Sequence, residues 1–228
     1  EIYNIFEDGE GAIGELQHLY GSNTFSLQSG AGYYYSEFDS RFEIKDPSFP
    51  YEEESDYQVR HANIYSYAQI EFPFEFVGTV GLSGELLESE FTDTDREELN
   101  PKLGITWQPT DSTLIRGAVF KTVTRSLVNS QTIEPTHVAG FNQFFDDALA
   151  SLVWSYGIGI DQRFSNTLFG GAQYLQRELD VPYIFIDDFG VQSPMEDDQR
   201  EQIGSAYLYW TPVEWMSLGL EYFYEDFE

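Results

Sequence analysis

SLVWSYGIGIDQRF, residues Ser151–Phe164, alternates between two kinds of side chain. One row is large and mostly apolar and consists of Leu152, Trp154, Tyr156, Ile158, Ile160 and Phe164. The row between them is mostly small or polar and includes Ser155, Gly157, Gly159, Asp161 and Arg163. Successive side chains of an extended chain leave opposite faces, so this period of two predicts a β-strand with one apolar and one hydrophilic face.

The same pattern recurs along the chain and predicts ten strands in all. It is clear at about 25–36, 62–72, 76–86, 102–108 and 215–225, and weaker at about 13–20, 112–124, 168–182 and 201–211. The connectors alternate in length, with short ones at 21–24, 72–75, 108–113, 164–167 and 211–214 and long, acidic ones near 39–56, 88–98, 125–150 and 180–200. We therefore expect tight turns at one side of a sheet and long charged loops at the other.

Composition excludes several classes of protein. Of the 228 residues, 40 are acidic and 11 are basic, giving a formal net charge of −29. This balance argues against nucleic-acid binding, which needs Lys and Arg to neutralise phosphates, and against electrostatic docking on an anionic membrane. The chain has no cysteine and no apolar run long enough for a transmembrane helix, but membrane-spanning strands need only about 9–11 residues.

The strands are expected to form a membrane barrel rather than a water-soluble β-sandwich, which is the alternative. Many are a dozen residues or longer, against about 5–6 for a typical strand. Aromatic residues gather beside the short turns, as in an interfacial girdle. We predict an all-β, antiparallel up-and-down transmembrane β-barrel. Residues 1–228 are expected to be a fragment of a larger barrel, because they show neither a signal peptide nor a plug domain.

One stretch resembles a known family. Within LNPKLGITWQPTDSTLIRGAVFKTVTRS (residues 99–126), Asn100, Pro101, Lys102, Gly104, Trp107, Pro109, Thr110, Asp111, Leu114 and Arg116 match the barrel region of TonB-dependent receptors and related bacterial outer-membrane proteins. IEPTHVAGFNQFFDD (residues 133–147) resembles a loop of outer-membrane barrels that follow a periplasmic tetratricopeptide-repeat segment. The resemblance implies a Gram-negative outer-membrane location and partners among membrane lipid, lipopolysaccharide and periplasmic or other envelope proteins.

Departures from that family pattern bear on the function. The chain lacks the plug, and it reads VTRSLVN (residues 123–129) where the receptors carry aromatic-Arg-Ala-Pro, which argues against siderophore or vitamin uptake. We expect a porin-like barrel that passes or exports a solute or polymer through a polar lumen. The alternative is a non-conducting anchor or adhesin that binds through its acidic loops.

Two sets of residues are candidate functional groups in such a barrel. Charges on the hydrophilic rows are expected to face the lumen and tune which solutes pass, and these are Glu71, Glu85, Lys102, Arg116, Asp161, Arg163, Arg177 and Glu221. The alternative is that they pair across strands and rigidify the wall. The long loop carries a possible constriction in Phe141, Asn142, Gln143, Phe144 and Phe145, unless that loop is an outer lid packed on neighbouring loops.

Catalysis is not expected. The three histidines, His18, His61 and His137, are scattered and lack metal-ligand spacing. Adjacent aspartates at 146–147, 187–188 and 197–198 do not follow a calcium-loop pattern and read as solvated acidic loop. Nucleophile elbows and phosphate-binding glycine loops are missing from the sequence, so no enzyme activity, metal or cofactor is predicted.

Overall fold

The computed structural model describes residues 3–44, 51–90, 94–125, 131–145, 147–186 and 192–228. The chain folds into strands throughout. They are β1 (Tyr3–Gly21), β2 (Phe25–Ile44), β3 (Tyr51–Phe72), β4 (Phe76–Ser89), β5 (Thr94–Thr110), β6 (Thr113–Val123), β7 (His137–Val138), β8 (Phe141–Asn142), β9 (Leu152–Arg163), β10 (Leu168–Ile186), β11 (Gln192–Val213) and β12 (Met216–Phe227). The described residues contain no helix with the length and apolar character needed to cross a membrane.

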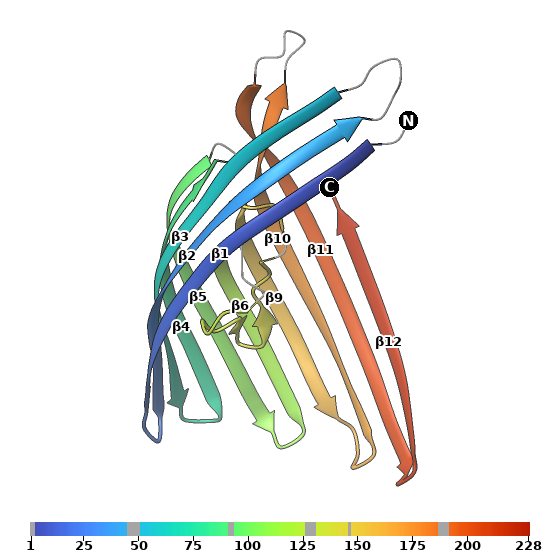
Figure 1. The fold of residues 1–228 in the computed structure, drawn as a ribbon. Helices are drawn as coiled ribbons and strands as arrows, with labels where there is room; N and C mark the ends of the chain where they lie inside the picture. The colour runs from blue at the N-terminus through green and yellow to red at the C-terminus, as the bar shows by residue number, and fades with distance from the viewer. Residues whose placement is uncertain (1–2, 45–50, 91–93, 126–130, 146, 187–191) are drawn as a thin grey trace.

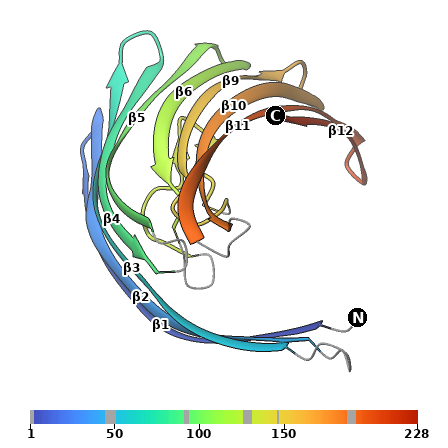
Figure 2. The same ribbon diagram turned by 90° about the horizontal axis from the view of Figure 1, so that it is seen from above.

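Ten of these strands form one antiparallel sheet in chain order, β1 to β6 followed by β9 to β12. Each strand inside this order pairs with its two neighbours, and all short turns lie at one end of the sheet (Figure 1). The sheet curves into an open arch when it is seen along the strands (Figure 2). This is the up-and-down architecture that the alternating pattern predicts.

The two faces of the arch differ as the opening stretch predicts. Ile158 lies on the convex face and is 62% exposed. Ser155, three residues earlier in the same strand, lies on the concave face and is 2% exposed. Paired residues share a face, and Asp161, Gly171, Tyr207 and Glu221 follow one another in register across β9 to β12. Strand register therefore carries the division into a concave and a convex row from β9 to β12.

The strands are longer than the sequence pattern indicates. Those from β1 to β3, and β10 and β11, contain 19 to 22 residues, so much of the loops expected at 39–56, 88–98 and 180–200 is strand. The apolar alternation is needed only over the roughly 9–11 residues that cross a bilayer. Beyond it, charged residues can pair between strands in water, as Arg41 of β2 does with Glu52 and Glu54 of β3.

The arch has two edges, β1 and β12, and these strands are not paired with each other. An unpaired strand edge in hydrocarbon leaves backbone N–H and C=O groups without partners, at several kcal/mol each. In a bilayer, both edges of this sheet therefore need hydrogen-bonding partners.

We predict that the convex face tolerates charge far less than the concave face. Ile158→Lys places an ammonium group between the aromatic residues Trp154 and Phe164 and should destabilise the protein in lipid vesicles by about 2–4 kcal/mol. Gln69→Lys, on the exposed part of the concave face of β3, is the matched control and should change stability by less than about 1 kcal/mol. Urea titration in vesicles measures both, and equal costs would contradict the assignment of the faces.

Candidate functional site: a loop docked on the concave face

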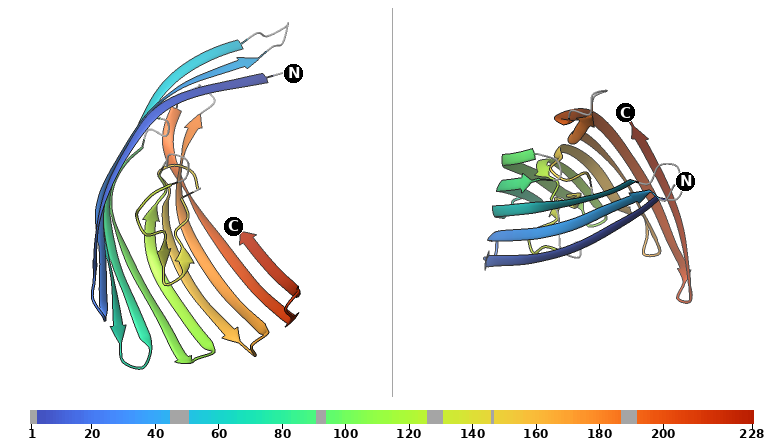
Figure 3. Two further views of the ribbon diagram at one scale, coloured as in Figure 1. Left: turned by 60° about the horizontal axis from the view of Figure 1, so that its bottom comes forward. Right: turned by 45° about the horizontal axis from the view of Figure 1, so that its top comes forward.

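The connection between β6 and β9 is folded onto the concave face of the arch. Its two ends are tied together, because Thr124 N donates to Ser151 O at 2.9 Å and Ala150 N donates to Thr124 O at 2.9 Å. The described part of the connection lies inside the curve of the sheet (Figures 2 and 3). We call residues 131–145 and 147–150 the inner loop.

The inner loop carries a small hairpin that reaches far down the wall. His137 pairs with Asn142 and Val138 with Phe141, and the turn residues Ala139 and Gly140 have φ values of 48° and 83°. Positive φ at both central residues suits a two-residue hairpin turn, which favours glycine. Gly140 O accepts a 3.1 Å hydrogen bond from Arg116. Arg116 lies eight residues below Thr124, a path of about 26 Å along the strand at 3.3 Å per residue, and its side chain meets the tip of the hairpin.

Small residues of the wall provide the seat for this hairpin. Gly104, Ala118 and Gly157 are adjacent in register across β5, β6 and β9. A Cβ atom on Gly157 would lie 2.6 Å from the Phe141 ring, and a Cβ atom on Gly104 would lie 2.7 Å from the Cβ of Ala139. The absence of these side chains is therefore what allows the hairpin to press against the sheet.

The hairpin buries apolar side chains in that seat. Val138 is 0% exposed and Phe141 is 2% exposed, and they pack with Phe120 of β6 and Leu175 of β10. Burying one such side chain contributes about 1.5–3 kcal/mol. The apolar side of the hairpin is thus the side that holds it to the wall.

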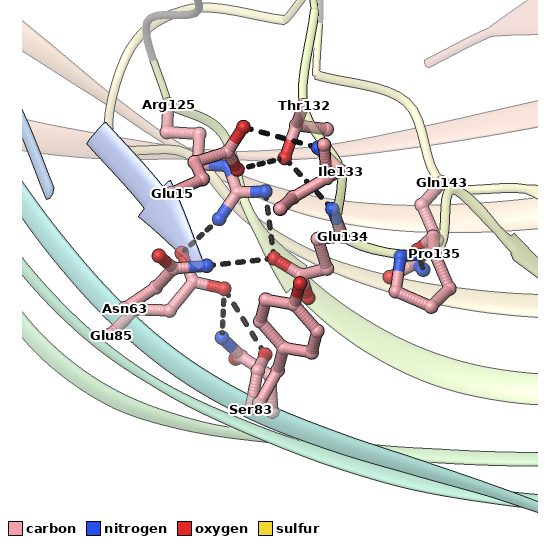
Figure 4. Close-up of polar contacts among 12 residues, drawn as sticks. Glu15, Asn63, Ser83, Glu85, Arg125, Thr132, Ile133, Glu134, Pro135 and Gln143 are labelled. Carbon is pink, nitrogen blue, oxygen red and sulfur yellow. Dashed lines mark hydrogen bonds and ion pairs between the residues drawn. The ribbon is translucent and has the colours of Figure 1, made fainter. Parts of the chain in front are cut away.

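A buried ion pair holds the loop at a second point. Arg125 NH2 donates to Glu134 Oε2 at 2.7 Å, and both side chains are 2% exposed. Glu134 also accepts from Asn63 Nδ2 at 2.9 Å and from the Tyr67 hydroxyl at 2.8 Å (Figure 4). Burial lowers the pKa of the Arg125 guanidinium, but the charges of Glu134 and Glu85 outweigh it and raise that pKa.

Glu85 forms the wall half of the same polar cluster. It accepts from Asn100 Nδ2 at 3.1 Å and from Ser83 Oγ at 3.2 Å, and its Oε2 lies 3.1 Å from His61 Nε2 and 3.9 Å from Arg125. Figure 4 shows Arg125 between the two carboxylates. A buried charge is tolerated only when it is paired and hydrogen-bonded, and both carboxylates meet this condition.

Two further arginines follow the same scheme. Arg116 donates through Nε to Asp161 of the wall at 3.0 Å and through Nη1 to Gly140 O of the loop. Arg177 pairs with Glu201 of the wall and with Asp147 of the loop. Each of the three arginines therefore joins a wall carboxylate to an acceptor of the inner loop.

Each arginine is also covered by one phenylalanine of the loop. The guanidinium carbons of Arg116, Arg125 and Arg177 lie 5.2, 4.8 and 4.8 Å from ring centroids. The rings are those of Phe141, Phe145 and Phe144 respectively. Cation–π contacts of this kind contribute about 0.5–2 kcal/mol each. We call these three groups the arginine clamps.

The inner loop also reaches the opposite side of the arch. Glu15 of β1 accepts from Thr132 Oγ1 at 2.6 Å and from Ile133 N at 3.1 Å. Gln17, also in β1, donates to Ile133 O at 2.6 Å. The loop thus spans the concave side from β6 and β9 to β1.

The structure places all eight predicted charges on the concave rows, but in different surroundings. Glu85, Lys102 and Arg177 are 3%, 1% and 5% exposed, and Arg116 pairs with Asp161. The others lie nearer the short turns or the β12 edge, where Arg163 donates to Asp111 O, Glu221 accepts from Tyr209 and Glu71 is exposed.

The predicted constriction residues divide between the two sides of the loop. Phe141 and Gln143 are buried, Phe144 and Phe145 are partly buried, and Asn142 is exposed. Gln143 donates to Pro135 O at 2.7 Å and to the Tyr67 hydroxyl at 3.3 Å. The first contact lies within the loop, and the second reaches β3 of the wall. That the loop narrows a pore stays a prediction.

Several residues that build this site escaped the sequence analysis, chiefly Arg125, Glu134, Glu15 and His61. The sequence contains one signal for Glu134. The other long connections are rich in Asp and Glu, whereas Glu134 is the only acidic residue between Arg125 and Phe145. Its partners Asn63 and Tyr67 are 71 and 67 residues away, so their pairing depends on strand register. Within the described ranges, no group of three or more His, Asp or Glu side chains is arranged to hold a metal ion.

No protein-family model matches the sequence, and no curated protein matches it. Solved structures do match the fold. The siderophore receptor PiuA from Acinetobacter baumannii has a TM-score of 0.68 and 14% identity, covering 98% of this chain and 39% of that chain. The ferric yersiniabactin uptake receptor FyuA from Yersinia pestis has a TM-score of 0.69 and 12% identity, covering 99% and 37%. The FrpB iron transporter from Neisseria meningitidis has a TM-score of 0.65 and 13% identity, covering 97% and 36%.

These likenesses confirm the predicted fold and the resemblance to the barrel region of TonB-dependent receptors. The similar structures are transporters and receptors rather than enzymes. The chain spans less than two fifths of the length of the solved chains it matches. At these identities the likeness concerns the fold, and the solutes of those receptors are their own.

We predict that adding one methyl group to the seat weakens loop docking. Gly157→Ala forces the Phe141 ring out of its position and should destabilise the protein by about 1–3 kcal/mol, as overpacking does. Amide hydrogen exchange over residues 131–145 should rise. Gly117→Ala in neighbouring β6 is the control, because its Cβ would meet only ordinary contacts at 3.8 Å. Unchanged exchange in Gly157→Ala would show that the seat does not hold the loop.

We also predict that the buried clamp at Arg125 stabilises more than surface pairs do. Glu134→Ala leaves a buried guanidinium without its main partner and should cost about 3–5 kcal/mol. Glu54→Ala removes an exposed partner of Arg41, whose side chain is 48% exposed, and should cost less than about 1 kcal/mol. Denaturant unfolding in detergent compares the two, and similar values would contradict the assigned role of Glu134.

Proposed function

From a fold shared with the barrels of outer-membrane receptors, we propose that the chain is part of a closed barrel that passes or exports a solute across the bacterial outer membrane. Further strands pair with β1 and β12 to complete the barrel. The convex face meets membrane lipid and lipopolysaccharide, and the concave face borders the polar lumen. In outer-membrane barrels the short turns face the periplasm, so the inner loop enters the lumen from the cell surface.

The observation that carries this proposal is the contrast between the two faces of the same strands. Exposed aliphatic side chains cover the convex face, with Ile64, Leu86 and Leu220 at 67%, 55% and 68% exposed. The concave face carries ion pairs and hydrogen-bonded amides, together with the apolar side chains that lie beneath the inner loop. A polar lumen surrounded by an apolar wall of about bilayer height is the arrangement that water-filled outer-membrane barrels use.

The inner loop supports a narrowed passage. It extends from β6 and β9 across the concave face to β1, and the tip of its hairpin lies within reach of the Arg116 side chain of β6. A lumen that contains this loop has a smaller cross-section over most of its height. Constrictions of this kind select solutes by size and by the groups that line them.

The same loop also supports a second candidate function, a non-conducting barrel that serves as an anchor or a surface-binding module. The loop contacts Glu15 and Gln17 of β1, so it connects the two sides of the described arch. If the remaining strands close tightly around the loop, the barrel is plugged by its own chain. The acidic strand ends above the bilayer would then carry the binding function.

Conductance separates the two functions. We expect the full-length protein in planar bilayers to give discrete conductance steps, and Gly157→Ala to enlarge them by loosening the loop. Uncharged sugars of graded size, tested by liposome swelling, measure the width of the passage. A correctly folded barrel that neither conducts ions nor admits the smallest sugar would contradict the transport function and favour the anchor.

A further inference from the structure

The inner loop covers four of the eight charged side chains that the sequence assigns to solute selection. Lys102, Glu85 and Arg177 are at most 5% exposed, and the Arg116 side chain is 15% exposed. A solute in the lumen cannot contact groups that are sealed beneath protein. The charges in the arginine clamps therefore hold the inner loop in place, which agrees with the alternative that the wall charges form pairs. A different surface must contact the solute on this side.

That surface is the side of the inner loop that points away from the wall. The hairpin has two faces, because the Val138–Phe141 pair is buried and the adjacent His137–Asn142 pair is exposed. Side chains of successive pairs in a hairpin point in opposite directions. One face is pressed onto Gly104 and Gly157, so the other is turned away from the wall. The described part of the loop lies within the curve of the arch (Figure 2).

The exposed face of the loop differs in charge from the rest of the molecule. The chain carries a net charge of −29 and 22% of its residues are charged. The exposed residues of the inner loop include neither Asp, Glu, Lys nor Arg. They are Gln131, Ile133, His137, Gly140, Asn142 and Ala148. The carboxylates of the inner loop, Glu134 and Asp147, turn to the arginine clamps instead.

We propose that this exposed face, centred on the His137–Asn142 pair, is the solute-contacting and specificity-determining surface on this side of the lumen. It suits uncharged solutes with hydrogen-bonding groups, because it offers carboxamides, an imidazole and one aliphatic side chain without a fixed charge. This inference rests on the transport function proposed above. It moves solute selection from the strand charges to residues that only the docked loop presents.

Cysteine labelling tests the proposal, since the 228 residues contain no cysteine. Asn142→Cys introduces a thiol on the exposed face. Ser155→Cys introduces one in the concave row of β9, where the serine is 2% exposed and lies two residues from the seat at Gly157. The probes are methanethiosulfonates that attach either an ammonium or a sulfonate group. We expect position 142 to react about tenfold faster or more, because thiol reactivity follows exposure.

The functional readout uses the same labelled protein in planar bilayers and liposomes. Sulfonate at position 142 should shift the reversal potential toward cation selectivity, ammonium should shift it toward anions, and both should slow entry of uncharged sugars. Ser155→Cys should keep the selectivity and sugar permeation of the unsubstituted protein. Each of these results supports a solute-facing loop.

Three outcomes overturn the proposal, and they are distinguishable. Equal labelling at both positions shows that the loop does not cover the wall. Complete labelling at position 142 without a change in ion selectivity or sugar entry shows that solutes do not contact this face. No conductance in the unsubstituted protein contradicts the transport function itself, and with it the solute-facing role, while the labelling contrast still reports whether the loop is docked.

Discussion

The structure depends on one constraint, which is that a strand in a bilayer must satisfy its backbone within a sheet while its side chains divide between lipid and the interior. Each residue of a spanning strand is committed to one of two environments by its parity in the sequence. Ile158 and Ile160 face outward, and Ser155 and Gly157 face inward, for this reason alone. The register then carries that division across all ten strands.

The inner loop uses the inward face in a way that a simple channel wall does not. Small residues at Gly104, Ala118 and Gly157 leave a depression, and arginines around it bind acceptors of the loop. Because removing water from a charge is costly, the clamps stabilise only with the loop in place, where each guanidinium has a carboxylate and an aromatic ring. The charges of the wall and the position of the loop are therefore parts of one arrangement.

The fold of this chain does not by itself determine its function. The arch is shared with siderophore receptors and with iron and copper transporters at 12–14% identity, and one fold can host many different functions. In this chain the wall carries arginine clamps, and the exposed residues of the described inner loop are uncharged. Function is then argued from the loop surface, while the strands supply the frame.

The sequence by itself determined the strands, their two faces and the side of the sheet that carries the short turns, because a period of two and turn-forming residues are local signals. It also placed Lys102, Arg116 and Arg177 on the concave rows. It missed the length of the strands beyond the bilayer, where water removes the need for apolar alternation. The tertiary structure alone decided that Arg125 meets Glu134, that Phe141 lies on Gly157 and that His137 is left facing the interior. These contacts join residues far apart in the chain, so they exist only once strand register has brought the seat, the clamps and the loop together.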